Sequence, residues 1–176
     1  MEFGYEGATI RRIAEEVGVS STALYMHFHD KSEILLEICR DAFERMLDGN
    51  REIRSGQGDP EAKVRRMLEA YMAFGLENPN AYRLVFLTRP QEASEAAEAV
   101  ARDLGRKVYE SFEDTVRELG ASGRLKVDVS LAAQALWAGA HGIVALIITK
   151  PYFAWAPPSE LGRTMIDGLF DGLLRT

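Results

Sequence analysis

The sequence predicts an all-α protein, with a small N-terminal helix-turn-helix head and a larger C-terminal helical bundle. Two observations predict this fold. Apolar residues recur at i, i+3, i+4 and i+7 over most of the chain, and helix-capping residues precede these stripes. No segment has the convincing alternating pattern of a strand. We expect the head at residues 1–48, with its helix-turn-helix at about 9–28, and the bundle at residues 49–176.

The head is predicted to contain three helices that each follow a capping residue. Thr9 precedes an apolar stripe formed by Ile10, Ile13, Ala14 and Val17. Gly18 should end that helix, since glycine readily adopts the left-handed backbone found just past a helix end. Ser20 should cap a second helix that ends near Phe28, and Asp30 a third from about Lys31 to Asp48.

The remaining helices are also delimited by caps, prolines and glycines. The glycine-rich stretch from Gly49 to Asp59 predicts the end of the third helix and a mobile loop. Beyond it we expect helices at about 60–77, 81–88, 92–119, 128–149 and 159–174. Asp59-Pro60 starts the first of these, Asp128 and Ser159 cap the last two, and breaks fall at Asn78-Pro79, Arg89-Pro90 and 120–123.

Several classes of protein find no support in the sequence. Cys39 is the single cysteine, so neither an internal disulfide nor a cysteine metal cluster can form, and no export signal precedes the first helix. These features predict a cytoplasmic protein. His27 and His29 lack a third ligand at metal-binding spacing. Because no catalytic or phosphate-binding motif appears either, we expect no enzyme activity, no metal and no cofactor.

The spacing of the head favours binding to double-stranded DNA. Two short helices joined by a tight glycine turn form a helix-turn-helix, whose second helix can enter the major groove. On a helical wheel Leu24 and Phe28 share one face, while Thr22 and Met26 point the opposite way with Tyr25 beside them. The spacing alone is only moderately specific, because any small helical bundle contains such turns.

Residues 9–35, TIRRIAEEVGVSSTALYMHFHDKSEIL, closely resemble the DNA-binding domain of the TetR family of repressors. The shared features are the threonine before the first helix, the IA pair, the GVS turn, the LY pair, and the aromatic-x-x-Lys-x-x-apolar ending. The resemblance implies DNA contacts from the second helix by Ser21, Thr22, Tyr25 and His27. It also implies phosphate contacts by Thr9 and Lys31, with Arg11 and Arg12 as weaker candidates.

Two features depart from the family pattern. Ala23 stands where the family usually has threonine, which removes one phosphate-bonding hydroxyl. The family's first helix should precede Gly4-Tyr5, where only Met1, Glu2 and Phe3 remain. An alternative function is therefore a dimeric helical ligand-binding or interaction module that no longer binds DNA.

The C-terminal half resembles a narrower group within the family. AYRLVF at 81–86 and WAGAHG at 137–142 are similar to a TetR subgroup named for a Trp-x-x-x-His-Gly signature. That resemblance implies a small apolar or aromatic effector and a homodimer. Eight side chains should line the effector site: Tyr71, Phe74, Tyr82, Phe86, Tyr109, Phe112, Trp137 and His141.

The same aromatic residues would also suit an ordinary core. His141 could be a core histidine, a hydrogen-bonding group of the pocket or, least of all, a metal ligand. A small helical enzyme that uses His141 is a further alternative, although no residue set favours catalysis.

Residues 129–149 are apolar enough to consider a transmembrane helix. Gln134, His141 and small residues spaced four apart instead favour a buried or dimer-forming helix, so we expect no membrane partner. The last helix carries a second apolar stripe. The expected dimer contacts are Ala138, Gly142, Met165, Leu169 and Gly172, and intrachain packing is the alternative.

Charge is the main caution against DNA binding. The chain has a net charge of −6, and its first fifty residues contain five basic and ten acidic side chains. Phosphate neutralisation needs Lys and Arg, but three of those bases, Arg11, Arg12 and Lys31, cluster near the predicted DNA surface. We therefore expect a transcriptional repressor that binds a palindromic operator and releases it when its effector binds.

Overall fold

The structure, a computed structural model, describes residues 7–87 and 95–175. Within these ranges every regular element is helical, in eight α-helices and one π-helical turn, with an isolated bridge between Leu125 and Leu174. This confirms the predicted all-α class. The expectations for residues 1–5, the break at Arg89-Pro90 and the helix start at Glu92 lie outside the described residues.

Helices α1 (Ile10–Val17) and α2 (Ser21–Tyr25) pack together as the predicted helix-turn-helix. Gly18 joins them with φ of 73°, a left-handed conformation that glycine adopts without strain. Helix α2 is shorter than predicted, because the N–H groups of His27 and Phe28 both bond to the carbonyl of Leu24 and close a tight turn there. The predicted side-chain caps form at Thr9, Ser20, Asp30, Asp59 and Asp128.

Helix α3 (Lys31–Ser55) continues well past the predicted loop start, so the expectation of a loop from Gly49 was wrong. Side chains satisfy carbonyls in its last turns: Lys63 Nζ donates to the Arg54 carbonyl at 2.7 Å, and the Ser55 hydroxyl donates to that of Glu52 at 3.0 Å. These contacts offset the low helix propensity of the glycine inside the helix.

The described chain divides into two compact units. One contains the residues up to Glu44 and the segment from Asn80 to Gly105, and the other contains the rest. Helix α5 (Pro79–Tyr82) starts at the boundary of the two units and leads into the π-helical turn η1 (Arg83–Leu87) of the first unit. A single α-helix over 81–88 was predicted here. Helix α6 (Glu95–Ala121) begins in the first unit and ends in the second. It continues through Gly120, where a loop was predicted to begin, and ends at Ala121.

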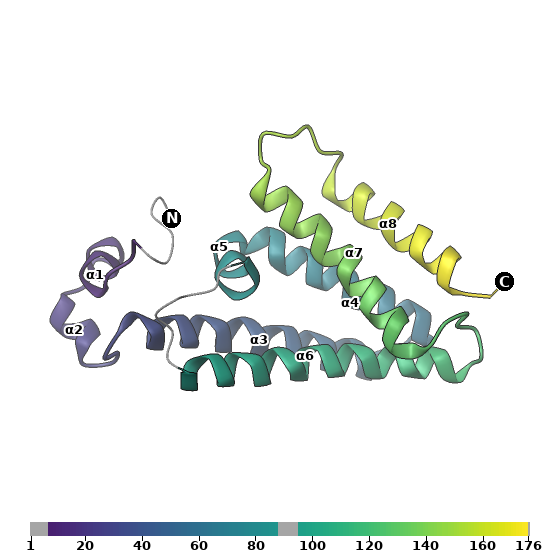
Figure 1. Cartoon of the computed structure of the whole chain (residues 1–176), viewed down its shortest axis with the longest axis horizontal. Coiled ribbons are helices and arrows are strands. Elements are labelled where there is room, and N and C mark those ends of the chain that lie inside the picture. The colour runs from purple at the N-terminus through teal and green to yellow at the C-terminus, as the bar shows by residue number, and fades with distance from the viewer. Residues whose placement is uncertain (1–6, 88–94, 176) are drawn as a thin grey trace. The chain divides into compact units, whose positions relative to one another are not determined.

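In the second unit, α7 (Val129–Thr149) packs against both α4 (Pro60–Glu77) and α8 (Pro158–Leu173), as Figure 1 shows. The fully buried positions on α7 are Leu136 and four smaller side chains: Ala132, Ala133, Ala140 and Val144. At Gly139 an added Cβ would lie 2.7 Å from Met165 Sδ and 2.9 Å from Leu169 Cδ1. Small residues therefore let α8 approach α7 closely.

Helix α7 is long and apolar enough to cross a membrane, with a mean hydropathy of 1.8 in its most apolar window. By itself one such helix is weak evidence of a membrane span, because the core helix of a globular bundle has the same composition. Its packing against α4 and α8 accounts for much of that apolar character.

Polar contacts join α4 to α8. Arg65 is half-buried, pairs with Glu61 at 3.1 Å and Asp167 at 2.5 Å, and lies 4.3 Å from the centre of the Phe170 ring. Ser159 was predicted to cap α8, but the helix starts one residue earlier, at Pro158, without a side-chain cap. A proline needs no partner for a backbone N–H, so the first turn leaves fewer unsatisfied donors.

The continuation of α3 through Gly49 can be tested by stability measurements. An added Cβ meets nothing within 4 Å at Gly49, whereas Gly58 has φ of +125° and Arg66 Nη2 at 3.2 Å. Gly49→Ala should raise the free energy of unfolding by about 0.5–1 kcal/mol, because alanine is the better helix former. Gly58→Ala should lower it. Chemical denaturation of both variants checks this, and destabilisation by Gly49→Ala would contradict the helical assignment.

Candidate DNA-binding and effector sites

The exposed face of α2 carries most of the residues predicted to contact DNA. Thr22 is exposed, the Tyr25 side chain is 52% exposed, and His27 is exposed in the turn that follows. Ser21 is half-buried at the start of the helix. Leu24 and Phe28 are half-buried on the opposite side. The exposed side of α2 is therefore distinct from the apolar side that faces the protein.

The predicted phosphate-binding residues lie at helix starts. Thr9 is exposed and its hydroxyl oxygen accepts the Arg12 N–H at 3.2 Å, which leaves the hydroxyl hydrogen able to donate to an anion. Lys31 is the first residue of α3 and is half-buried. Helix N-termini favour negative charge, so both positions suit a phosphate.

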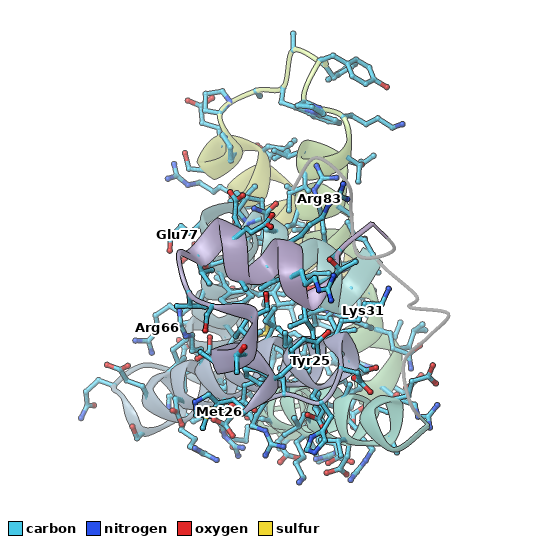
Figure 2. All side chains as sticks on the ribbon, turned by 90° about the vertical axis from the view of Figure 1, so that its left-hand side faces the viewer. Tyr25, Met26, Lys31, Arg66, Glu77 and Arg83 are labelled. Carbon is cyan, nitrogen blue, oxygen red and sulfur yellow. The ribbon has the colours of Figure 1, made fainter. Side chains whose placement is uncertain are left out.

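One exposed residue of this region was not among the predicted contacts. Met26 is 80% exposed and directly follows α2 (Figure 2). The helical wheel already placed Met26 opposite Leu24 and Phe28. The family pattern supplied Ser21, Thr22, Tyr25 and His27 as contacts and did not include Met26.

Four of the eight predicted effector residues form one contiguous cluster on α4, α6 and α7. The Tyr71 hydroxyl lies 3.1 Å from His141 Nδ1. The Trp137 ring lies 5.9 Å from the His141 ring and 5.7 Å from the Tyr109 ring, between centroids. Burial lowers the pKa of His141 below its usual value, so the neutral ring can accept a hydrogen bond from the Tyr71 hydroxyl through Nδ1.

Tyr109 adds a second phenol to this cluster. Its hydroxyl oxygen is buried and forms no hydrogen bond of ordinary geometry with the described residues, although the side chains of Ser130, Gln134 and Glu113 lie close to it. Burial, followed by the negative charge of Glu113, raises the pKa of Tyr109 and outweighs the opposing effect of Ser130 and Gln134. The phenol therefore stays protonated, and a buried donor of this kind gains most from a bound acceptor.

Of the other four predicted effector residues, two lie in the first unit and two in the second. Tyr82 is fully buried in the first unit, where its ring lies 4.8 Å from that of Phe86, and Phe43 meets Phe86 edge-on at 5.9 Å. Phe74 is half-buried on α4, and Phe112 is buried on α6.

The predicted dimer residues fall into two groups. Met165 and Leu169 are half-buried beside Gly139 within the same chain. Ala138 is exposed, and an added Cβ would meet nothing within 4 Å at Gly142 or Gly172. Leu131 and Leu146, 53% and 46% exposed, continue the open apolar stripe of Ala138 and Gly142 along α7.

Two family models match this architecture. A model described as bacterial regulatory proteins, tetR family, matches residues 1–38, and one described as tetracyclin repressor-like, C-terminal domain, matches residues 64–169. The second match alone spans more than half of the chain. The chain belongs to the TetR family. Members of this family are DNA-binding transcriptional regulators, as the head predicted. The Trp-x-x-x-His-Gly subgroup stays a prediction.

Known TetR proteins resemble this chain in sequence and in structure. The HTH-type transcriptional activator FasR of Mycolicibacterium smegmatis is 31% identical over 96 residues, covering 52% of this chain and 44% of that protein. The chain thus matches less than half the length of this relative. The TetR family regulator PfmR of Thermus thermophilus has a TM-score of 0.79 and 26% identity, covering 99% and 91% of the two chains.

The fatty acid degradation regulator FadR of Bacillus halodurans has a TM-score of 0.81 at 19% identity, covering 98% of this chain and 92% of that one. At that identity the likeness shows the shared TetR fold.

The lowered pKa of His141 predicts a pH dependence of stability. Below the usual value of 6.5 the unfolded chain binds a proton at this site more readily than the folded chain does. Stability should therefore be complete above that value and fall as the pH drops through 6.5 toward the lowered pKa. Thermal unfolding from about pH 8 to about pH 5 measures the loss. His141→Gln should lose less over the same range, and an equal loss would remove His141 as a cause.

Proposed function

We propose that this TetR protein is a ligand-responsive repressor whose operator affinity falls when a small apolar molecule binds its C-terminal domain. The observation that carries the proposal is the helix-turn-helix at α1 and α2, capped at both starts and turned at Gly18, with Thr22 and Tyr25 exposed on its second helix. We divide the chain into a DNA-binding domain at 1–48 and an effector-binding and dimerisation domain at 49–176, and place the protein in the cytoplasm.

In this proposal the second helix enters the major groove of double-stranded DNA. Ser21, Thr22, Tyr25 and His27 contact bases and the adjacent backbone, while Thr9 and Lys31 bind phosphates. The acidic net charge of −6 does not prevent this, because the basic side chains Arg11 and Arg12 lie on the exposed side of α1. The alternative of a module that has lost DNA binding is less well supported, because the DNA-binding family model matches residues 1–38.

The cluster of Tyr71, His141, Trp137 and Tyr109 supports the effector site. It offers aromatic surface together with the buried Tyr109 phenol, which forms no hydrogen bond of ordinary geometry with the described residues. An effector with an apolar body and one hydrogen-bond acceptor, such as a fatty acid or an aromatic acid, matches this chemistry. The name of the structurally similar FadR, a fatty acid degradation regulator, agrees with that class.

A homodimer would place two reading heads on a palindromic site, with half-sites about one helical turn apart. The open stripe on α7, with Ala138 and Gly142 at its centre, offers the surface for a second copy, and Gly172 offers another on α8. Burying Leu131 and Leu146 there would remove two exposed leucines from water. Effector binding would favour a different spacing of the two DNA-binding domains. A coupling free energy of about 1–3 kcal/mol would weaken operator binding about 5–150-fold.

Selection from random duplexes, followed by binding measurements at several salt concentrations, tests the DNA contacts. Lys31→Ala should weaken binding to all duplexes about equally and reduce the salt slope by about 1, because one phosphate contact is lost. Lys150→Ala is the matched control, since it removes the same charge from the exposed loop after α7. If the two variants had the same DNA affinity and the same salt slope, Lys31 would not be part of the interface. A wild type that selects no duplex would refute the proposal.

Titration of the operator complex with saturated fatty acids of graded length and with simple aromatic acids tests the effector site. At least one should release the operator, and Tyr109→Phe should weaken its apparent binding about fivefold, the loss expected for one hydrogen bond. Tyr152→Phe, at a position 79% exposed, is the control and should change nothing. Constant operator affinity in the presence of acids shown to bind by calorimetry would overturn the coupling.

A further inference from the structure

We propose that Met26 reads the 5-methyl group of thymine in the major groove, so that each operator half-site depends on a thymine opposite this residue. The inference rests on the proposed DNA-binding function and assigns a specificity-determining role to a side chain that the family pattern did not select.

Met26 occupies the centre of the outward edge of the reading helix. Leu24 and Phe28 are half-buried on the inward side, and successive helical residues are about 100° apart, so Met26 projects opposite their midpoint. Its backbone is helical, with φ of −70° and ψ of −22°, and its N–H donates to the Thr22 carbonyl at 3.1 Å. The wheel therefore still applies at Met26, although α2 itself ends one residue earlier.

The neighbours of Met26 on this edge offer few hydrogen bonds. Ala23 is exposed on one side and Thr22 on the other, which leaves one hydroxyl among three central side chains. The Ser20 hydroxyl oxygen already accepts the Ala23 N–H at 3.1 Å as the helix cap. Residues 20–28 contain no Arg, Lys, Asn or Gln, the side chains that form paired hydrogen bonds with guanine or adenine.

The chemistry of the groove then selects the partner. Hydrogen-bonding atoms line the major groove, and its distinctive apolar group is the thymine methyl. A flexible, polarizable thioether can adapt its shape to pack on a methyl group without burying a strong hydrogen-bonding group. If Met26 packed against the edge of a guanine or a cytosine, it would exclude water from the hydrogen-bonding groups of that base and leave them unpaired. A duplex is the occupant that the flanking Thr22 and Tyr25 and the tetR family match at residues 1–38 favour.

The test uses the full chain and the operator obtained by selection, with each thymine replaced singly by deoxyuridine, which lacks only the methyl group. At the position opposite Met26 this change should weaken wild-type binding about fourfold per half-site, the value expected for one buried methyl. Cytosine replaced by 5-methylcytosine at that position should recover part of the loss.

Met26→Ala should bind the thymine and deoxyuridine operators equally, while Met26→Leu should retain a preference for thymine. Val17→Ala, at a position 60% exposed on α1, is the control and should keep the full difference. Circular dichroism of each variant verifies that the fold is intact.

Three results would overturn the inference while leaving DNA binding standing. The wild type could bind both operators equally at every thymine, Met26→Ala could keep the full difference, or Met26→Ala could change only the oligomeric state seen by sedimentation, which would assign the residue to a second copy. A wild type that selects no duplex would refute the proposed function itself, and this inference with it.

Discussion

The close packing of α7 between α4 and α8 is the constraint on which the second unit depends. Alanines at 132, 133 and 140 are fully buried, and Gly139 leaves room for Met165 and Leu169. Large side chains at these positions would push the helices apart, because protein interiors have almost no spare volume. Since α7 also carries Trp137 and His141, the same packing fixes the orientation of these two side chains toward Tyr71 on α4.

That packing leaves α7 with two different faces. One face is filled by its own chain, whereas the stripe through Ala138 and Gly142 stays open with exposed leucines at either end. The sequence presents the two sets of small residues alike, as pairs spaced four apart. The three-dimensional arrangement separates Gly139, which serves intrachain contact, from Gly142, which is available to another surface. Periodicity can show that helices approach closely, but it cannot tell which partner they approach.

The fold class, the α1–Gly18–α2 motif and five side-chain caps could be predicted, because each depends on residues within a few positions of one another. The extent of α3 could not, since it is supported by Lys63, which lies nine residues from the carbonyl that it satisfies. The aromatic set was predicted as one group. Tyr82 and Phe86 instead lie in the first unit, where Phe86 contacts both Tyr82 and Phe43, and the other six lie in the second unit. This division follows from tertiary packing that no local pattern records.

The π-helical turn at Arg83–Leu87 has a consequence for how this chain tolerates changes in length. A π-turn closes its hydrogen bonds over five residues where an α-turn uses four, so it accommodates one surplus residue without leaving the helical path. Removing one residue here would let the turn relax to α geometry and rotate Phe86 relative to Tyr82, which would break their tilted ring contact. A one-residue deletion at this point would thus rotate the side chains on one side of the turn relative to those on the other. Most substitutions would leave that relative orientation unchanged.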